Sequence, residues 1–122
     1  MPPSNDGPGR STLALHAGTA PDPTTGSRVP PLHQTTSYVF PDADEAAARF
    51  ALESEGHVYS RISNPTVAAL ERRLTALEGG AGAVATASGM AAFDALVFVL
   101  ASAGDNVVTA TDLYGGTSTY LS

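Results

Sequence analysis

From residue 64 onward, the sequence alternates segments typical of helices with segments typical of buried strands. Asn64 and Pro65 suit the N-cap and the first position of a helix, and apolar residues then recur at helical spacing. Two glycines at residues 79–80 are expected to end this helix. Short apolar runs at residues 81–87 and 107–110 predict two strands, with a second helix between them. This order requires parallel strands joined by helical crossovers, so we expect an α/β fold.

The turn after the first predicted strand is a candidate phosphate site. It consists of Ser88, Gly89 and Met90 and leads directly into the second helix. Backbone N–H groups at a helix start attract anions, Gly89 allows close approach to the backbone, and Ser88 adds a hydroxyl donor. Taken alone, the turn also fits an ordinary strand-to-helix connection. Tyr114 follows the second predicted strand, and loops after parallel strands meet at one edge of a sheet.

The region before residue 64 has a different character. Residues 1–11 are rich in Pro, Gly and Ser, which predicts a disordered tail. Residues 12–63 form a predicted N-terminal arm, in which repeated prolines forbid a continuous helix. We expect one helix there, capped by Asp42 or Asp44 and ended by Gly56. An arm this long cannot bury itself, so we expect it to lie across another subunit.

The region 64–122 is predicted to be the start of a large domain. Two parallel strands would leave an open sheet edge and uncovered faces. We therefore expect the chain to be the N-terminal part of a longer protein.

Composition excludes several classes of function. The formal charge is −6, from six Arg and no Lys against twelve acidic residues, which argues against a nucleic-acid partner. There is no Cys, and the three His lie too far apart for a zinc site. No segment resembles a signal peptide or a membrane span, so we expect a cytoplasmic protein. A dinucleotide-binding domain is disfavoured, because no Gly-x-Gly-x-x-Gly turn follows the first predicted strand.

Three motifs, in order and at matching spacing, resemble the Cys/Met-metabolism family of pyridoxal-phosphate (PLP) enzymes, which have fold type I. They are residues 59–66 (YSRISNPT), 88–90 (SGM) and 112–117 (DLYGGT), and the resemblance extends from residue 12 to about residue 117. Within the family, residues 16–18 (HAG) and 31–38 (PLHQTTSY) look most similar to the O-acetylhomoserine sulfhydrylases.

The resemblance implies a role for each candidate residue. Backbone N–H groups of Gly89 and Met90, with Ser88, would hold the cofactor phosphate. Tyr59 and Arg61 would reach across a dimer interface to the neighbouring subunit's cofactor, although composition alone predicts a surface Arg and a half-buried Tyr. Tyr114 would stack on the pyridine ring and relay protons to the substrate, which makes it the candidate catalytic residue.

The resemblance also implies an activity, γ-replacement of the acetate of O-acetylhomoserine by sulfide or a thiol, in a homodimer or homotetramer. Cystathionine γ-synthase and methionine γ-lyase are the alternatives. PLP enzymes need a Lys for a Schiff base and a carboxylate for the pyridinium nitrogen. In the family both lie beyond residue 122, and this chain has no Lys. We therefore expect the 122-residue chain to be inactive, and a non-catalytic fragment stays a rival interpretation.

Overall fold

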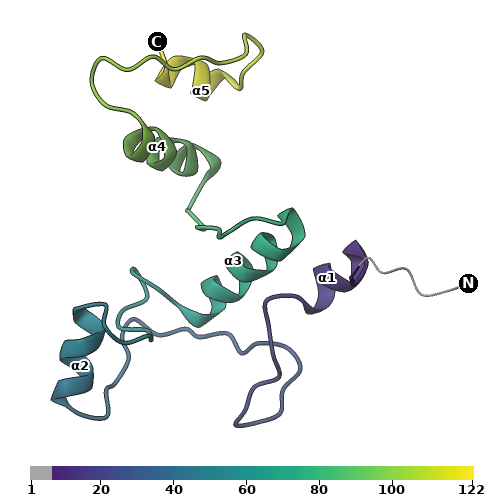
Figure 1. Cartoon of the computed structure of the whole chain (residues 1–122), viewed down its shortest axis with the longest axis vertical. Helices are drawn as coiled ribbons and strands as arrows, with labels where there is room; N and C mark the ends of the chain where they lie inside the picture. Colours follow the sequence, from purple (N-terminus) through teal and green to yellow (C-terminus); the bar gives the residue numbers. More distant parts are fainter. Residues whose placement is uncertain (1–6) are drawn as a thin grey trace, which may run out of the picture. The chain divides into compact units, whose positions relative to one another are not determined.

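The computed structural model describes residues 7–122, which divide into two compact units between Ala83 and Val84 (Figure 1). The first unit contains α1 (Arg10–His16), α2 (Ala43–Phe50) and α3 (Pro65–Glu78), and the second contains α4 (Gly89–Leu100) and α5 (Gly115–Tyr120).

The local signals for α3 act as predicted. The Asn64 side chain accepts a hydrogen bond from the Thr66 N–H at 2.8 Å, and Pro65 opens the helix. Gly79 ends it in the left-handed conformation, with φ 62°. A glycine adopts this conformation without steric penalty, which explains why the helix stops there.

The predicted end of α2 was wrong. Asp42 caps the helix start as expected, but the helix ends at Phe50 rather than near Gly56. The Glu53 N–H donates to the Ala48 carbonyl at 2.9 Å, while Leu52 takes the left-handed conformation with φ 61°. In this pattern, N–H groups just past the helix bond to the last carbonyls of the helix, so the helix stops without a glycine.

The predicted strands at residues 81–87 and 107–110 do not form among the described residues. Both segments lack regular secondary structure. A strand exists only when a neighbouring segment pairs with its backbone in a regular ladder, and the described residues show no such ladder at either segment. The pairing that residues 7–122 do show is one antiparallel bridge, between Ser37 and Tyr59.

Two helices occupy segments predicted to be irregular. Arg10 and Ser11 belong to α1 rather than to a disordered tail, and residues 1–6 of that predicted tail lie outside the described residues. The region 12–63 therefore contains part of α1 as well as α2, not one helix. The segment after Tyr114, which was predicted to be a loop, is helical from Gly115 onward and forms α5.

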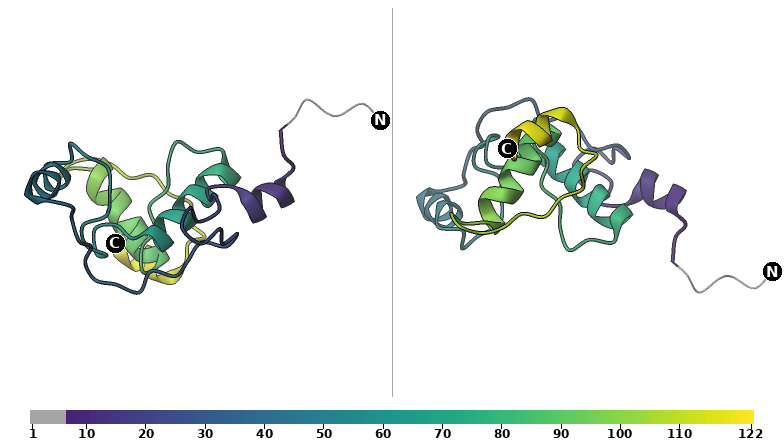
Figure 2. Two further views of the ribbon diagram at one scale, coloured as in Figure 1. Left: turned by 90° about the horizontal axis from the view of Figure 1, so that it is seen from below. Right: turned by 90° about the horizontal axis from the view of Figure 1, so that it is seen from above.

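The arm is attached to α3 by hydrogen bonds from arginine side chains. Arg73 Nε donates to the Ala17 carbonyl at 3.1 Å, and Arg72 Nε donates to the Gly18 carbonyl at 2.8 Å. The helices α1 and α3 pack against one another, as Figures 1 and 2 show. Among the described residues no hydrophobic side chain is fully buried, so polar contacts organise this unit.

Candidate functional site

Tyr59 and Arg61 lie in the first unit, on the segment that leads into α3. The Tyr59 backbone forms the bridge with Ser37, and its carbonyl accepts from the N–H groups of Ile62 and Ser63 at 2.9 and 3.0 Å. This turn brings the Arg61 guanidinium over the Tyr59 ring, 5.4 Å from its centroid. The two predicted phosphate ligands therefore form a pair, and stacking on the ring orients the guanidinium.

A polar network fixes the segment that carries this pair. Ser60 donates its hydroxyl to the Thr35 carbonyl, and Asn64 Nδ2 donates to Ser60 Oγ at 2.9 Å and to the His33 carbonyl at 3.0 Å. Asn64 is 8% exposed and is the buried polar residue of the described chain. Thr66 Oγ1 accepts from the His33 N–H at 2.9 Å. The network holds the arm beside the loop that presents Tyr59 and Arg61.

Arg61 is available for an anion. It is exposed, and the ion pairs found in residues 7–122 join Arg10 to Glu78 and Arg49 to Glu45. Tyr59 is 40% exposed beside it. A guanidinium with no carboxylate partner offers a planar set of donors that matches phosphate.

The predicted phosphate turn lies in the second unit, at the start of α4. Ser88 is the N-cap, and its Oγ accepts from the Ala91 N–H at 3.1 Å. Because Oγ accepts that bond, its proton is free to be donated outward. The Ala92 N–H is the first to bond along the helix, to the Ser88 carbonyl at 3.1 Å, so the N–H groups of Gly89 and Met90 precede the helical ladder.

The helix start is also sterically open. A Cβ placed at Gly89 would meet nothing within 4 Å. Free N–H donors, a hydroxyl donor and open space at the positive end of a helix fit a phosphate group.

The structure brings the Met90 turn and the Tyr114 loop together. The Thr117 hydroxyl donates to Met90 Sδ at 3.5 Å, and Gly116 lies close to the Tyr114 ring. Tyr114 is 76% exposed, so its ring is open to a ligand. The sequence predicted that these two loops share one edge of a sheet. They meet in the structure, although no sheet forms among the described residues.

The sequence reasoning missed the contacts that join α5 to α4. The Tyr120 hydroxyl donates to Asp94 Oδ1 at 2.6 Å, and the Tyr120 ring meets Phe93 edge-on, with centroids 5.8 Å apart. The hydrogen bond to Asp94 raises the pKa of Tyr120 above its ordinary value. These partners lie 26 residues apart. No local sequence pattern around Asp94 or Tyr120 predicts a contact over this separation.

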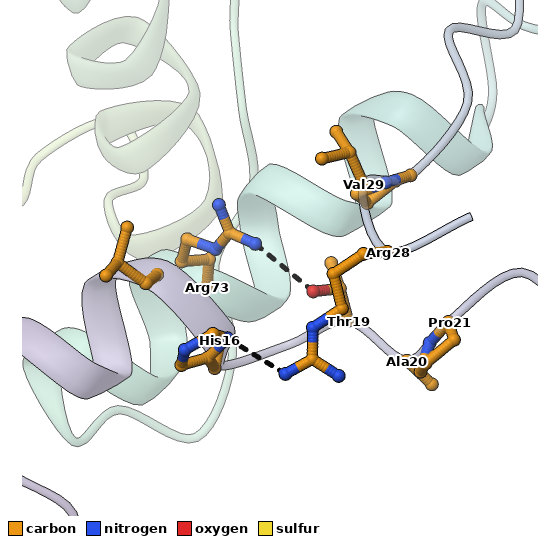
Figure 3. A pocket seen from close by; sticks show the side chains of 9 residues that line it. His16, Thr19, Ala20, Pro21, Arg28, Val29 and Arg73 are labelled. Atoms are coloured by element: carbon orange, nitrogen blue, oxygen red, sulfur yellow. Dashed lines mark hydrogen bonds between the residues drawn. The ribbon is translucent and has the colours of Figure 1, made fainter. Parts of the chain in front are cut away.

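A pocket in the first unit contains none of the predicted cofactor residues (Figure 3). Its cationic side chains already bind other groups of the protein. Arg73 donates to Thr19 Oγ1 at 3.2 Å, and Arg28 contacts His16 Nδ1 at 3.4 Å. The remaining lining is largely apolar, from Leu15, Ala20, Pro21, Val29 and Pro30.

Other classes of site are absent from the described part of the chain. Residues 7–122 contain no cluster of His, Cys, Asp or Glu side chains that could hold a metal ion. Over the same residues, no helix has both the length and the apolar character needed to cross a membrane.

The chain belongs to the family of Cys/Met metabolism PLP-dependent enzymes, because the model of that family matches residues 11–122. It is 58% identical over 106 residues to O-acetyl-L-homoserine sulfhydrylase 1 of Thermus thermophilus, a match that covers 87% of this chain and 25% of that protein. It is 46% identical over 118 residues to L-methionine gamma-lyase of Pseudomonas putida, covering 97% of this chain and 30% of that protein.

A solved structure agrees with these matches. It is that of a protein assigned as an O-acetylhomoserine (thiol)-lyase, from Campylobacter jejuni, and it carries an N'-pyridoxyl-lysine-5'-monophosphate. The TM-score is 0.86 at 48% identity, covering 93% of this chain and 28% of that one. The likeness is consistent with fold type I. The chain spans about a quarter of the length of the relatives it matches.

Proposed function

We propose that this chain forms the N-terminal quarter of a PLP enzyme that replaces the acetate of O-acetylhomoserine with sulfide or a thiol. The meeting of the Met90 turn with the Tyr114 loop carries the proposal, because it unites a phosphate cradle with an exposed aromatic ring. The 58% identity to a sulfhydrylase, against 46% to a methionine gamma-lyase, favours γ-replacement over elimination.

Each predicted residue has a role in this proposal. The N–H groups of Gly89 and Met90 and the hydroxyl of Ser88 hold the cofactor phosphate at the start of α4. Tyr114 lies against the pyridine ring and passes protons to and from the substrate. When bound, PLP supplies the electron sink for the reaction. The Lys and the carboxylate that it requires come from outside this chain, which has no Lys.

Tyr59 and Arg61 complete the phosphate site of a neighbouring subunit. Both side chains are exposed on a segment whose backbone is fixed by the Asn64 network. This arrangement suits ligands that act outward, across an interface, in a homodimer or homotetramer. The small-molecule partners are an amino acid and sulfide or a thiol.

The test uses the complete protein that the coding sequence specifies. We expect the purified protein to carry bound PLP and to form homocysteine from O-acetylhomoserine and sulfide. Release of methanethiol from methionine at a higher kcat/KM would instead support the methionine γ-lyase alternative. Absence of PLP binding and of both activities would support the rival proposal of a non-catalytic chain.

Arg61→Ala tests the phosphate role separately. The variant loses a charge-assisted, paired contact, so we expect PLP to dissociate about tenfold or more faster. Arg28→Ala, which removes an exposed Arg outside the predicted site, is the matched control. Equal PLP retention by both variants would remove Arg61 from the site.

A further inference from the structure

A side chain at Gly116 could not be accommodated without a shift of the Tyr114 ring from its present position. A Cβ built on Gly116 would lie 2.8 Å from Tyr114 Cε1 and 3.3 Å from Cδ1, and 3.7 Å from Met90 Sδ. Real Cβ atoms essentially never approach a heavy atom within 3.0 Å. Any side chain at this position therefore excludes the observed ring placement.

The requirement for glycine comes from the ring and not from the backbone. Gly116 does not have the positive φ that would itself favour glycine. Its neighbour Gly115 also lacks a positive φ, and a Cβ there would meet nothing within 4 Å. The two consecutive glycines at the start of α5 thus differ in what a Cβ would meet, which at Gly116 is chiefly the Tyr114 ring.

The backbone next to Gly116 is held in place by a contact between α5 and α4. Thr117 donates to Met90 Sδ at 3.5 Å, which ties the first turn of α5 to the first turn of α4. Tyr114 itself is 76% exposed, so few contacts would oppose its rotation into solvent. A methyl group at residue 116 is therefore expected to displace the ring and to leave the backbone in place.

We propose that Gly116 is a positioning residue, whose missing side chain lets the Tyr114 ring lie over the start of α5 next to the Met90 turn. The inference rests on the proposed function, in which that ring stacks on the cofactor. In this proposal Gly116 acts through Tyr114 and not by its own contact with the cofactor.

The main experiment compares Gly116→Ala with Gly115→Ala in the full-length, PLP-loaded protein. We expect Gly116→Ala to alter the visible circular dichroism of bound PLP and to lower kcat about tenfold or more, because small displacements of a catalytic group have large effects on rate. Gly115→Ala should match the wild type in both. Indistinguishable spectra and rates for the two variants would overturn the proposal.

A double-mutant comparison separates the ring from every other role of Gly116. In a Tyr114→Ala background no ring remains to be displaced, so adding Gly116→Ala should change neither the spectrum nor kcat further. An undiminished effect in that background would overturn the proposal. If Gly116→Ala alone fails to fold, recovery of folding in the double variant supports the clash, and failure of both overturns it.

A structural measurement does not depend on PLP. Crystal structures of the cofactor-free variants should show the Tyr114 ring displaced in Gly116→Ala and unmoved in Gly115→Ala. If the wild type binds no PLP, the proposed function fails, yet this measurement still tests the steric part. An unmoved ring in Gly116→Ala overturns the inference, as does a displaced ring with an unchanged PLP spectrum in a protein that does bind the cofactor.

Discussion

In the first unit, side chains of α3 reach the backbone of the arm, whereas in the second unit several large apolar side chains of α4 are exposed. Arg72 and Arg73 bind carbonyls of residues 17 and 18, and Asn64 binds the carbonyl of His33. These bonds span between 31 and 56 residues of sequence. They define where the arm lies without requiring a buried apolar core.

In the second unit the comparable contacts join α5 to α4, from Tyr120 to Asp94 at 2.6 Å and from Thr117 to Met90 Sδ at 3.5 Å. Most of the apolar surface of α4 remains open. Its exposed large apolar residues are Leu96 (54%), Phe98 (84%), Val99 (76%) and Leu100 (73%).

The difference shows that two kinds of sequence information are at work. Directed hydrogen bonds specify a local arrangement from a few residues, because each bond has a narrow range of distance and angle. Apolar burial is non-directional and needs a second surface before it stabilises anything. We therefore expect the first unit to respond sharply to single substitutions and α4 to tolerate them on its exposed face.

The largest effect is expected from Gly18→Ala, compared with Gly26→Ala. Both glycines have nearly the same left-handed φ, 73° and 72°. A Cβ at Gly18 would lie 2.6 Å from the backbone N of Arg73, while at Gly26 it would meet nothing within 4 Å. We expect losses of about 3 kcal/mol and about 1 kcal/mol in stability, respectively. Native-state hydrogen exchange of α3 measures both, and equal losses would show that α3 does not constrain residue 18.

Asn64→Ala compared with Ser88→Ala contrasts the two units directly. Both residues cap a helix, but Asn64 also donates to Ser60 and to His33. We expect about 2 kcal/mol of lost protection in the first turn of α3, and about 1 kcal/mol in α4 for Ser88→Ala. Hydrogen exchange resolves the two helices in one experiment. A smaller loss for Asn64→Ala than for Ser88→Ala would contradict the importance of the arm contacts.

A pH dependence caused by histidine is expected in the first unit alone. Burial lowers the pKa of His57 below its ordinary value of 6.5, and the charges of His33 and Arg72 act in the same direction. Between the lowered pKa and 6.5 the unfolded state binds the proton and the folded state does not, so stability falls as pH drops below 6.5. We expect His57→Gln to flatten this decline, measured as hydrogen-exchange protection corrected for intrinsic rates.

The second unit provides the control for that measurement, because all His residues of the chain precede residue 84. A decline in α4 protection parallel to that in α3, between pH 6.5 and 5, would assign the effect to another group.

The smallest effect is expected from Phe98→Ser in the 122-residue chain. The side chain is 84% exposed, so we expect the stability of α4 to change by about 0.5 kcal/mol or less. Binding of a hydrophobic fluorescent dye should decrease, because the variant removes exposed aromatic surface. Phe93→Ser, which removes the ring packed on Tyr120, is the contrasting variant and should destabilise α5. Unchanged dye binding in Phe98→Ser would show that the surface is not open.

The sequence alone determined the starts of α2, α3 and α4 and the stop of α3, because capping bonds and left-handed glycines act within a few residues. It also determined the motifs on which the family assignment rests, since these depend on residue types and spacing. The proposed cofactor roles of Tyr59, Arg61, Ser88, Gly89, Met90 and Tyr114 stay predictions.

Only the tertiary structure decided which distant residues meet. The contact of Thr117 with Met90, the position of Gly116 under the Tyr114 ring, and the contact of Arg73 with the arm have no local signature. The strand predictions failed for the related reason that a strand needs a regular ladder with a second strand, which the described residues form at neither 81–87 nor 107–110. Helix caps are short-range, whereas strand pairing and side-chain contacts depend on where the rest of the chain lies.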